Sequence, residues 1–411
     1  MTLALLSLEE YQDHAKTVTE RSFLQTEEMA TLLTKRGMKT QFVGLKKEGQ
    51  VVVSGILYSL PMTGGLHMEM NSGPVSTDQS YLAEFYKDLQ LYAKENGALQ
   101  LIVKPYDTYQ TFDSDGQATS EEQKHLMTDL TGIGYQFDGL QTGYPGGEPD
   151  WHYVKDLSNL TQDNFPNSLS KKGKVLLKKA NTFGIKVRPL AREELDQFKA
   201  ITSATSERRE YADKSLEYYQ DFYDAFGDKA QFLLASINFQ DYLANLNQQE
   251  AKLQKKLAAI HSFLEQQPNS KKKQNEAREI SSQIATFETR KEEAQELLNT
   301  YGQEDVALAA SLFVYSQHEL VYLFSGSLTE FNKFYAPVIL QEAAIREAIR
   351  RGISFYSFLG ITGIFDGSDG VLRFKQNFNG YIVRKMGTFR YYPQPAKVKA
   401  IQFIKKVLRR Q

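Results

Sequence analysis

Residues 241–300 read DYLANLNQQEAKLQKKLAAIHSFLEQQPNSKKKQNEAREISSQIATFETRKEEAQELLNT, and this stretch decides the most extended part of the fold. Apolar residues recur in steps of three and four, first over residues 243–264 and then over residues 277–298, with polar residues between them. The sequence QQPNS at 266–270 interrupts the pattern. A heptad seam broken by a turn predicts an antiparallel coiled-coil arm of two helices.

Each half of this seam contains one charged residue, Glu250 in the first helix and Lys291 in the second. Folding the hairpin about residues 266–274 brings Glu250 opposite Lys291 and Leu257 opposite Ile284. We therefore predict a cross-helix ion pair between Glu250 and Lys291 that fixes the register at some cost in stability.

Two similar successions of helices and strands lie outside the arm. The first has a helix, two strands, a helix and a strand, at residues 27–36, 40–46, 51–60, 79–96 and 98–103. The second has two helices, three strands, a helix and a strand, at residues 192–205, 215–226, 231–237, 306–315, 320–324, 333–351 and 353–359. Both end with a helix, a glycine and a strand, which indicates two copies of one α/β unit, although two unrelated α/β domains would give a similar order.

The arm interrupts the second copy between its first two strands. We therefore expect an α/β (α+β) chain with four parts. These are a first domain over 1–155, a second domain over 156–240 and 301–394, the arm over 241–300, and a basic C-terminal helix over 395–411.

The composition is that of a globular protein, with 411 residues of which 41% are hydrophobic. Cysteine is absent, which excludes disulfides and thiolate metal sites and fits a reducing compartment. The six histidines lack metal-ligand spacing, so we expect no metal. The chain starts without a basic region, and its longest apolar stretch, 306–315, is about half of a membrane span. We expect a cytoplasmic protein without a transmembrane segment.

A net charge of −1 hides two basic segments that contain no acidic residue. They are residues 164–192 and residues 371–411. Clusters of this kind suit phosphate-rich partners, although either one alone also fits an ordinary solvated helix face.

Several familiar catalytic motifs are absent from the sequence. There is no phosphate-binding loop ending in Gly-Lys-Ser/Thr, no dinucleotide-binding Gly-x-Gly-x-x-Gly after a strand, and no Gly-x-Ser-x-Gly elbow. We therefore expect no cofactor and no covalent catalysis. Direct attack of a bound nucleophile on an already activated acyl group fits better, with the protein supplying position and charge.

Three unusual loops are candidates for binding. The turn Asn71-Ser72-Gly73-Pro74 precedes a helix, where backbone amides can hold an anion, with a plain turn as the alternative. Lys104-Pro105-Tyr106-Asp107 follows the end of a strand, where α/β sheets tend to place ligands. The rigid loop at residues 143–151 ends in the only Trp and is equally compatible with a structural corner.

The remaining candidates are basic. Five lysines open a helix and offer a broad surface to a polyanion: Lys171, Lys172, Lys174, Lys178 and Lys179. Arg208 and Arg209 lie between two helices, and paired guanidinium groups suit pyrophosphate. The Gly-rich loop at 360–370 leads into a short helix that carries Arg373 and Lys375.

In this combination of motifs and basic residues, the chain resembles the FemABX family of non-ribosomal peptidyl transferases. The resemblance covers essentially the whole chain. It rests on the Arg373-Phe-Lys375-x2-Phe378 motif, the turn at 71–74, the lysine-rich helix, the arm, and the runs at 144–151 and 365–380.

The family resemblance implies two GNAT-like acyltransferase domains, the second of which bears the arm. It also implies transfer of an amino acid from aminoacyl-tRNA to the amine on the stem-peptide lysine branch of lipid II, during peptidoglycan synthesis. The amino acid is alanine in the branch of the family that the chain resembles most. Such an enzyme would be a monomer working at the inner face of the plasma membrane, in peripheral contact with lipid and with other cell-wall enzymes.

The resemblance also assigns roles to residues. Lys375 matches the family lysine that binds phosphate or stabilises the developing oxyanion, and Asp107 lies near an acidic position after the strand. Lys35 or Arg36, and Arg208 or Arg209, correspond to contacts with the precursor's phosphates, without a choice within each pair. With these we group Asn71, Ser72, Gly73, Lys104, Tyr106 and Arg373 as substrate-binding residues, and the five lysines as tRNA-binding residues.

Two other functions remain open at this point. An acyl-CoA-dependent N-acyltransferase on the same fold would usually have a Gln/Arg-x-x-Gly-x-Gly/Ala turn, which the sequence lacks. A non-catalytic tRNA-binding or scaffold protein would use the arm for docking and would not depend on Lys375.

Overall fold

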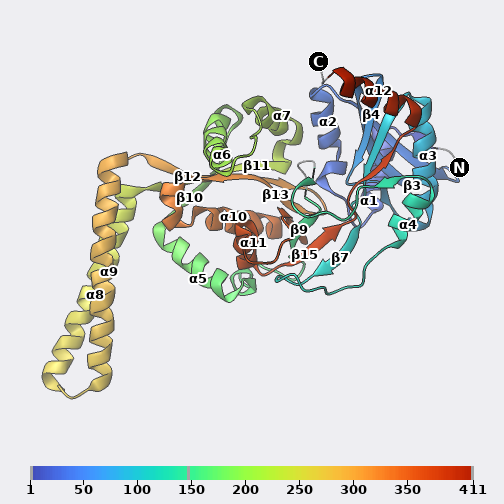
Figure 1. Cartoon of the computed structure of the whole chain (residues 1–411). Helices are drawn as coiled ribbons and strands as arrows, with labels where there is room; N and C mark the ends of the chain where they lie inside the picture. The colour runs from blue at the N-terminus through green and yellow to red at the C-terminus, as the bar shows by residue number, and fades with distance from the viewer. Residues whose placement is uncertain (1–2, 146–148, 409–411) are drawn as a thin grey trace.

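The computed structural model describes residues 3–145 and 149–408 (Figure 1). Two mixed β-sheets form the body, and the arm projects from the second of them. The first sheet has the order β1 (Ala4–Leu5), β2 (Lys39–Lys47), β3 (Gln50–Met62), β4 (Gly65–Asn71), β6 (Ala98–Lys104), β16 (Phe389–Tyr391) and β8 (Gln136–Phe137), with β5 (Val75–Ser76) paired to β3. The second has the order β10 (Lys186–Pro189), β11 (Ala230–Asn238), β12 (Asp305–Tyr315), β13 (Leu320–Ser327), β14 (Phe355–Ile361), β9 (Trp151–Asp156), β15 (Tyr381–Lys385) and β7 (Thr108–Phe112).

Each sheet contains one parallel pair among antiparallel neighbours. In the first sheet β4 runs parallel to β6, and helix α3 (Leu82–Glu95) connects them. In the second sheet β13 runs parallel to β14, and helix α10 (Ala336–Arg350) connects them. The repeated order expected from the sequence is therefore present in space, and the expected α/β fold class with an inserted antiparallel coiled coil is confirmed.

The two sheets exchange strands, which the expected domain limits did not anticipate. Strands β7 and β9 come from the first 156 residues and lie in the second sheet, whereas β16 lies in the first sheet. The limits at residues 155 and 394 therefore do not separate the sheets. Pairing between strands far apart in the chain leaves no mark in local periodicity, so the sequence could not show this exchange.

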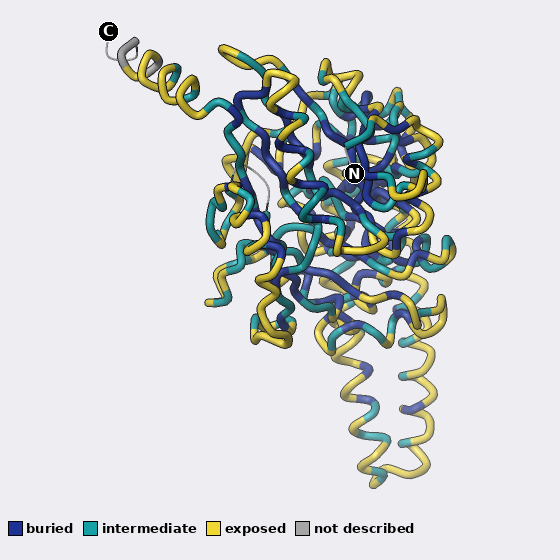
Figure 2. The backbone as a smooth tube through the Cα atoms, turned by 90° about the vertical axis from the view of Figure 1, so that its right-hand side faces the viewer, coloured by how far each residue is buried: buried dark blue, intermediate teal, exposed yellow. Residues whose placement is uncertain are grey.

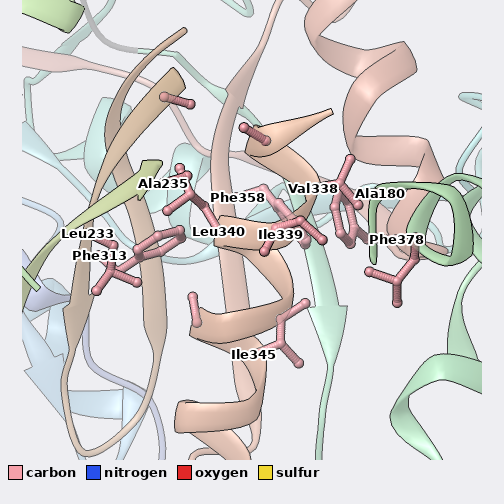
Figure 3. Close-up of a cluster of buried hydrophobic side chains, with 14 of the residues drawn as sticks. Ala180, Leu233, Ala235, Phe313, Val338, Ile339, Leu340, Ile345, Phe358 and Phe378 are labelled. Atoms are coloured by element: carbon pink, nitrogen blue, oxygen red, sulfur yellow. The ribbon is translucent and has the colours of Figure 1, made fainter. Parts of the chain in front are cut away.

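Helices cover the sheets on both faces. Helices α1 (Leu8–Thr17), α2 (Glu27–Lys35) and α4 (His125–Gly132) belong to the first half of the chain, and α5 (Lys171–Ala180), α6 (Leu195–Arg209) and α7 (Leu216–Phe226) to the second. The largest core lies between the second sheet and α10, where Figure 3 shows Leu340 of α10 near Phe313 of β12. A separate core lies on the other face under α6 and α7, and a third between the first sheet and α3.

The arm consists of α8 (Phe239–Gln266) and α9 (Lys271–Tyr301), as predicted (Figure 1). Lys291 forms an ion pair with Glu250, whose side chain is 6% exposed, so the predicted pair and register are confirmed. Leu257 and Ile284 pack in the same small cluster of the seam. Figure 2 shows that the arm beyond its base is mostly exposed to solvent.

The last helix, α12 (Pro395–Leu408), projects from the body in Figure 2. Ile401 lies beside Gly64 of the β3–β4 turn, and Phe403 and Ile404 are exposed. Residues 409–411 of the expected helix, and residues 146–148 of the aromatic loop, lie outside the described residues. Within the described ranges, no helix is long and apolar enough to cross a membrane.

Candidate active site

Lys375 ends the short helix α11 (Gly370–Lys375), which a single carboxylate holds in place. Asp369 accepts hydrogen bonds from the amides of Val371 at 2.8 Å and Leu372 at 3.0 Å, and so caps the first turn. Its second oxygen accepts from Thr362 at the end of β14, both from the amide and from the hydroxyl, at 2.9 Å. The hydrogen bonds between Thr362 and Asp369 therefore close the loop at 362–369. The side chain of Lys375 points inward, and the residue is 3% exposed.

The ammonium group of Lys375 lies at the end of strand β14. Its Nζ donates to the carbonyl oxygens of Gly360 at 2.6 Å and Leu359 at 3.1 Å. Leu359 adopts a left-handed conformation with a φ of 55°, which turns these carbonyl groups toward the lysine. Burial lowers the pKa of Lys375 to about 7, although the charge of Asp369 opposes the shift. At neutral pH this lysine can therefore both donate and accept a proton.

Strands β13 and β14 separate beside Lys375. Their parallel pairing is confined to two positions, from Leu320 and Val321 of β13, whereas β14 pairs with β9 along its other edge as far as Ile361. Tyr144 donates to the carbonyl of Gly360 at 3.3 Å on the exposed side of this opening. Burial raises the pKa of Tyr144, and the nearby charge of Arg209 opposes that rise. Arg209 therefore lies close enough to interact with an anion that binds in the opening beside Lys375.

A second group of candidate residues lines a cavity of about 280 Å³ beside the first sheet. Asp107 and Tyr106, which follow β6, line it together with Glu20 and Pro74. Burial raises the pKa of Asp107, and the positive charges of Lys385 and then His125 oppose the rise. A carboxyl group with a raised pKa at a cavity wall can accept a proton from a bound amine.

Strand β9 lies between β14, which carries the carbonyl partners of Lys375, and β15, which ends at Lys385. His152 of β9 pairs with Gly360 of β14 on one side and with Val383 of β15 on the other. Burial, together with the charges of Lys385 and Lys375, lowers the pKa of His152 to about 3. Lys385 in turn acts on Asp107. Both lysines therefore act on one neutral histidine, and Lys385 also acts on the Asp107 carboxyl group.

The predicted phosphate contacts occupy different environments. Lys35 and Arg36 at the end of α2 contact Asp221 of α7, at 2.9 Å and 3.6 Å, and Arg36 lies over the ring of Tyr218. Arg208 donates to the carbonyl of Ser327 and bonds Thr329. Arg209 is exposed and its charge opposes the rise in the pKa of Tyr144, which separates it from Arg208.

The turn at residues 71–74 contributes less than its sequence suggested. The carbonyl of Asn71 accepts from Gln25 at 2.6 Å, and a side chain at Gly73 would meet Gln25. Ser72 donates to the side chain of Asn71 at 3.3 Å, so Pro74 is the residue of this turn that reaches the cavity. Lys104 is paired with Glu69 at 3.1 Å and, unlike Tyr106, does not line the cavity.

The lysine-rich helix α5 packs directly on the segment that carries Lys375. A Cβ atom at Gly173 would lie 1.9 Å from the carbonyl oxygen of Asn377, so only glycine permits this approach. The hydroxyl of Ser170 donates to the same carbonyl at 3.2 Å. The exposed residues on this surface are Lys171, Lys172, Lys174, Lys178 and Lys179, with Arg373 exposed on α11. A basic surface therefore lies immediately outside the lysine site.

Three polar residues of this region were missed by sequence reasoning: His152, Glu319 and Lys385. Each lies in or beside a largely apolar strand, without a recognisable motif around it. The available sequence signal for these residues was a Lys or Glu at the end of a strand whose other residues have the apolar pattern of a buried core strand. The loop at 143–151, by contrast, ends in a structural corner, because Trp151 is buried against Phe112.

A buried lysine with a lowered pKa and a carboxyl group at a cavity wall are groups that can serve acyl transfer. The sequence matches the FemAB family over residues 6–406, and the chain belongs to this family. It is an aminoacyltransferase.

Relatives and a solved structure cover almost the entire chain. The chain is 29% identical over 398 residues to "Aminoacyltransferase FemA" of Staphylococcus aureus strain RF122, covering 95% of this chain and 94% of the relative. It is 28% identical to the FemA of Staphylococcus epidermidis strain RP62A, with 95% of each covered. The crystal structure of FemX superposes with a TM-score of 0.76 at 20% identity, over 96% of this chain and 98% of FemX, and shows the same fold.

Proposed function

We propose that the chain transfers L-alanine from aminoacyl-tRNA to the amine of the stem-peptide lysine branch of lipid II, during synthesis of the peptidoglycan interpeptide bridge. The observation that carries this proposal is the buried Lys375, with its lowered pKa, directly beneath the lysine-rich helix α5. Membership of the FemAB family supports the aminoacyl transfer. The resemblance described above supplies the donor, the acceptor and the amino acid.

The site offers a group for each proton and charge of the reaction. An aminoacyl ester is already activated, so attack by the acceptor amine forms a C–N bond and a negatively charged oxygen. Asp107 accepts the proton that the amine loses. Lys375 stabilises the oxyanion and, with its pKa of about 7, gives a proton to the ribose oxygen as the ester C–O bond breaks.

The basic surface of α5 is the proposed site for tRNA. Five exposed lysines lie on a helix that contacts the Lys375 segment through Gly173. Neutralisation of phosphates by lysine drives binding without sequence preference, and the helix directs the bound strand toward the reacting ester. Arg373 lies on the same side and is assigned to substrate binding.

The anionic groups of lipid II are assigned to arginines at the ends of α2 and α6, not to the lysines of α5. Arg36 and Arg209 are the proposed contacts of the precursor's phosphates, because Arg208 is tied to Ser327 and Thr329 and Lys35 to Asp224. The helix α12 carries exposed Phe403 and Ile404 in a segment without acidic residues. Such a face favours peripheral contact with an anionic membrane surface at the cytoplasmic side.

One assay tests the function. Radiolabelled Ala-, Ser- and Gly-tRNA are each offered with bare lipid II and with lipid II that already carries one branch residue. Label in lipid II from Ala-tRNA alone supports the proposal, and the acceptor that receives it defines the branch position. Absence of transfer from all three donors, by protein that binds them, refutes it.

A further inference from the structure

Lys385 lies where the two sheets meet. It is the last residue of β15 in the second sheet, and β16 of the first sheet begins four residues later. Its backbone amide donates to the carbonyl of Asp150 at 2.8 Å, which fixes the strand end. Its side chain reaches the link between β6 of the first sheet and β7 of the second, where its Nζ donates to the carbonyl of Tyr106 at 2.7 Å and lies 3.6 Å from the centre of the Tyr106 ring.

Tyr106 and its neighbour Asp107 are held by further contacts between distant segments. The hydroxyl of Tyr106 donates to Glu319 of the β12–β13 turn at 2.9 Å, and the other oxygen of Glu319 accepts from the amide of Phe23 at 2.8 Å. The carbonyl of Asp107 accepts from the amide of Met386 at 3.3 Å. Tyr106 and Asp107 are therefore clamped by β15 on one side and by Glu319 on the other.

Charges around Asp107 come from four elements. Lys385 on β15 and His125 on α4 favour its carboxylate form, whereas Glu20, in the loop after α1, opposes it. The buried hydroxyl of Tyr86 on α3 also lies near this carboxylate. Lys385 itself faces Glu319, Glu20 and Asp107, and burial lowers its pKa to about 8. Lys385 is thus the cation with the largest effect on Asp107.

We propose that Lys385 is a positioning residue for the transfer reaction, which fixes the Tyr106–Asp107 segment at the cavity and keeps Asp107 in its carboxylate form. The role rests on the proposed function of Asp107 as proton acceptor.

The pH dependence of transfer tests this role, because a merely structural residue would not move it. In Lys385→Gln the amide can still donate to the carbonyl of Tyr106, but the charge is lost. The acid limb of kcat/KM against pH should then move to higher pH by about one unit or more, because a nearby cation stabilises a carboxylate by roughly that amount. Lys385→Arg, which keeps the charge, should restore the limb toward its original position.

Lys155→Met is the matched control. Lys155 is 4% exposed, donates to the carbonyls of Ser168 and Asn379 at 3.3 Å, and has a pKa that burial lowers to about 8. It does not act on Asp107, so its loss should leave the acid limb in place. A limb that stays at the wild-type pH in Lys385→Gln, or moves equally in Lys155→Met, overturns the proposal.

Asp107→Asn separates this inference from the proposed function. If transfer and its acid limb persist in Asp107→Asn, the assignment of Asp107 fails; if they are lost while Lys385→Gln has no effect on the limb, only the role of Lys385 fails. Should Lys385→Gln not fold, the Asp107 carboxyl is titrated in the wild-type enzyme by carbon NMR, with Asp107→Asn for assignment. A carboxyl still protonated at neutral pH would then contradict the proposal.

Discussion

Replacement of Lys375 by Met should abolish function without weakening the fold. A drop of the Lys375 pKa from 10.5 to about 7 corresponds to a cost of about 5 kcal/mol for keeping the charged form buried, at roughly 1.4 kcal/mol for each pKa unit. Loss of its hydrogen bonds removes the lysine donor from the carbonyl of Leu359 and leaves the carbonyl of Gly360 with the longer bond from Tyr144, at roughly 1–3 kcal/mol for each bond lost. These effects nearly cancel, so at neutral pH the free energy of unfolding should stay within about 2 kcal/mol of the wild type.

The pH dependence of stability gives the sharper signature. Because the Lys375 pKa is lower in the folded chain, the unfolded chain binds more protons between about pH 7 and pH 10.5. Stability contributed by this residue therefore rises with pH across that window, by at most about 1.4 kcal/mol per pH unit. The difference in unfolding free energy between wild type and Lys375→Met should accordingly shift in favour of the wild type as the pH rises.

The measurements are denaturant unfolding at several pH values and aminoacyl transfer under saturating donor. We expect transfer to fall at least tenfold in Lys375→Met, because an oxyanion donor is lost. Lys87→Met, at an exposed position on α3, serves as the control and should change neither quantity. Near-normal transfer by folded Lys375→Met, or a stability difference that does not vary with pH, would refute the reasoning.

Three further predictions concern the surroundings of the site and the arm. Arg209→Ala should reduce transfer more than tenfold at unchanged melting temperature, whereas Arg208→Ala, which loses bonds to β13, should mainly lower the melting temperature; the reverse pattern would show that the wrong arginine faces the substrate. Gly173→Ala should lower stability by about 1–3 kcal/mol and slow transfer, because its methyl group must push α5 away from the Lys375 segment, as thermal unfolding and transfer assays would reveal. Lys291→Leu should destabilise the arm by roughly 3–5 kcal/mol, since the carboxylate of Glu250 stays buried without its cation, and Leu at both positions should restore it; hydrogen exchange of α8 and α9 measures this, and equal protection in both variants would contradict it.

The sequence predicted much of the local structure and the types of residues near the site. The basic helix at residues 171–180 and the Arg373–Lys375 motif were visible because side-chain type and spacing are local properties. Their contact was not, since it depends on the approach of Gly173 to Asn377 across about 200 residues of chain. The choice between Arg208 and Arg209 depended in the same way on which side of α6 faces the opening.

By itself the sequence determined the arm with its register, because a heptad seam and a charged pair at matching depth encode both helices and their alignment. It also determined the two helix–glycine–strand endings. Only the tertiary structure decided which strands the sheets exchange, and that Lys385 holds the carbonyl of Tyr106 in the link between β6 and β7. Strand partners and the pKa values of Lys375 and Asp107 depend on burial and on charges brought together from distant segments, which no local pattern records.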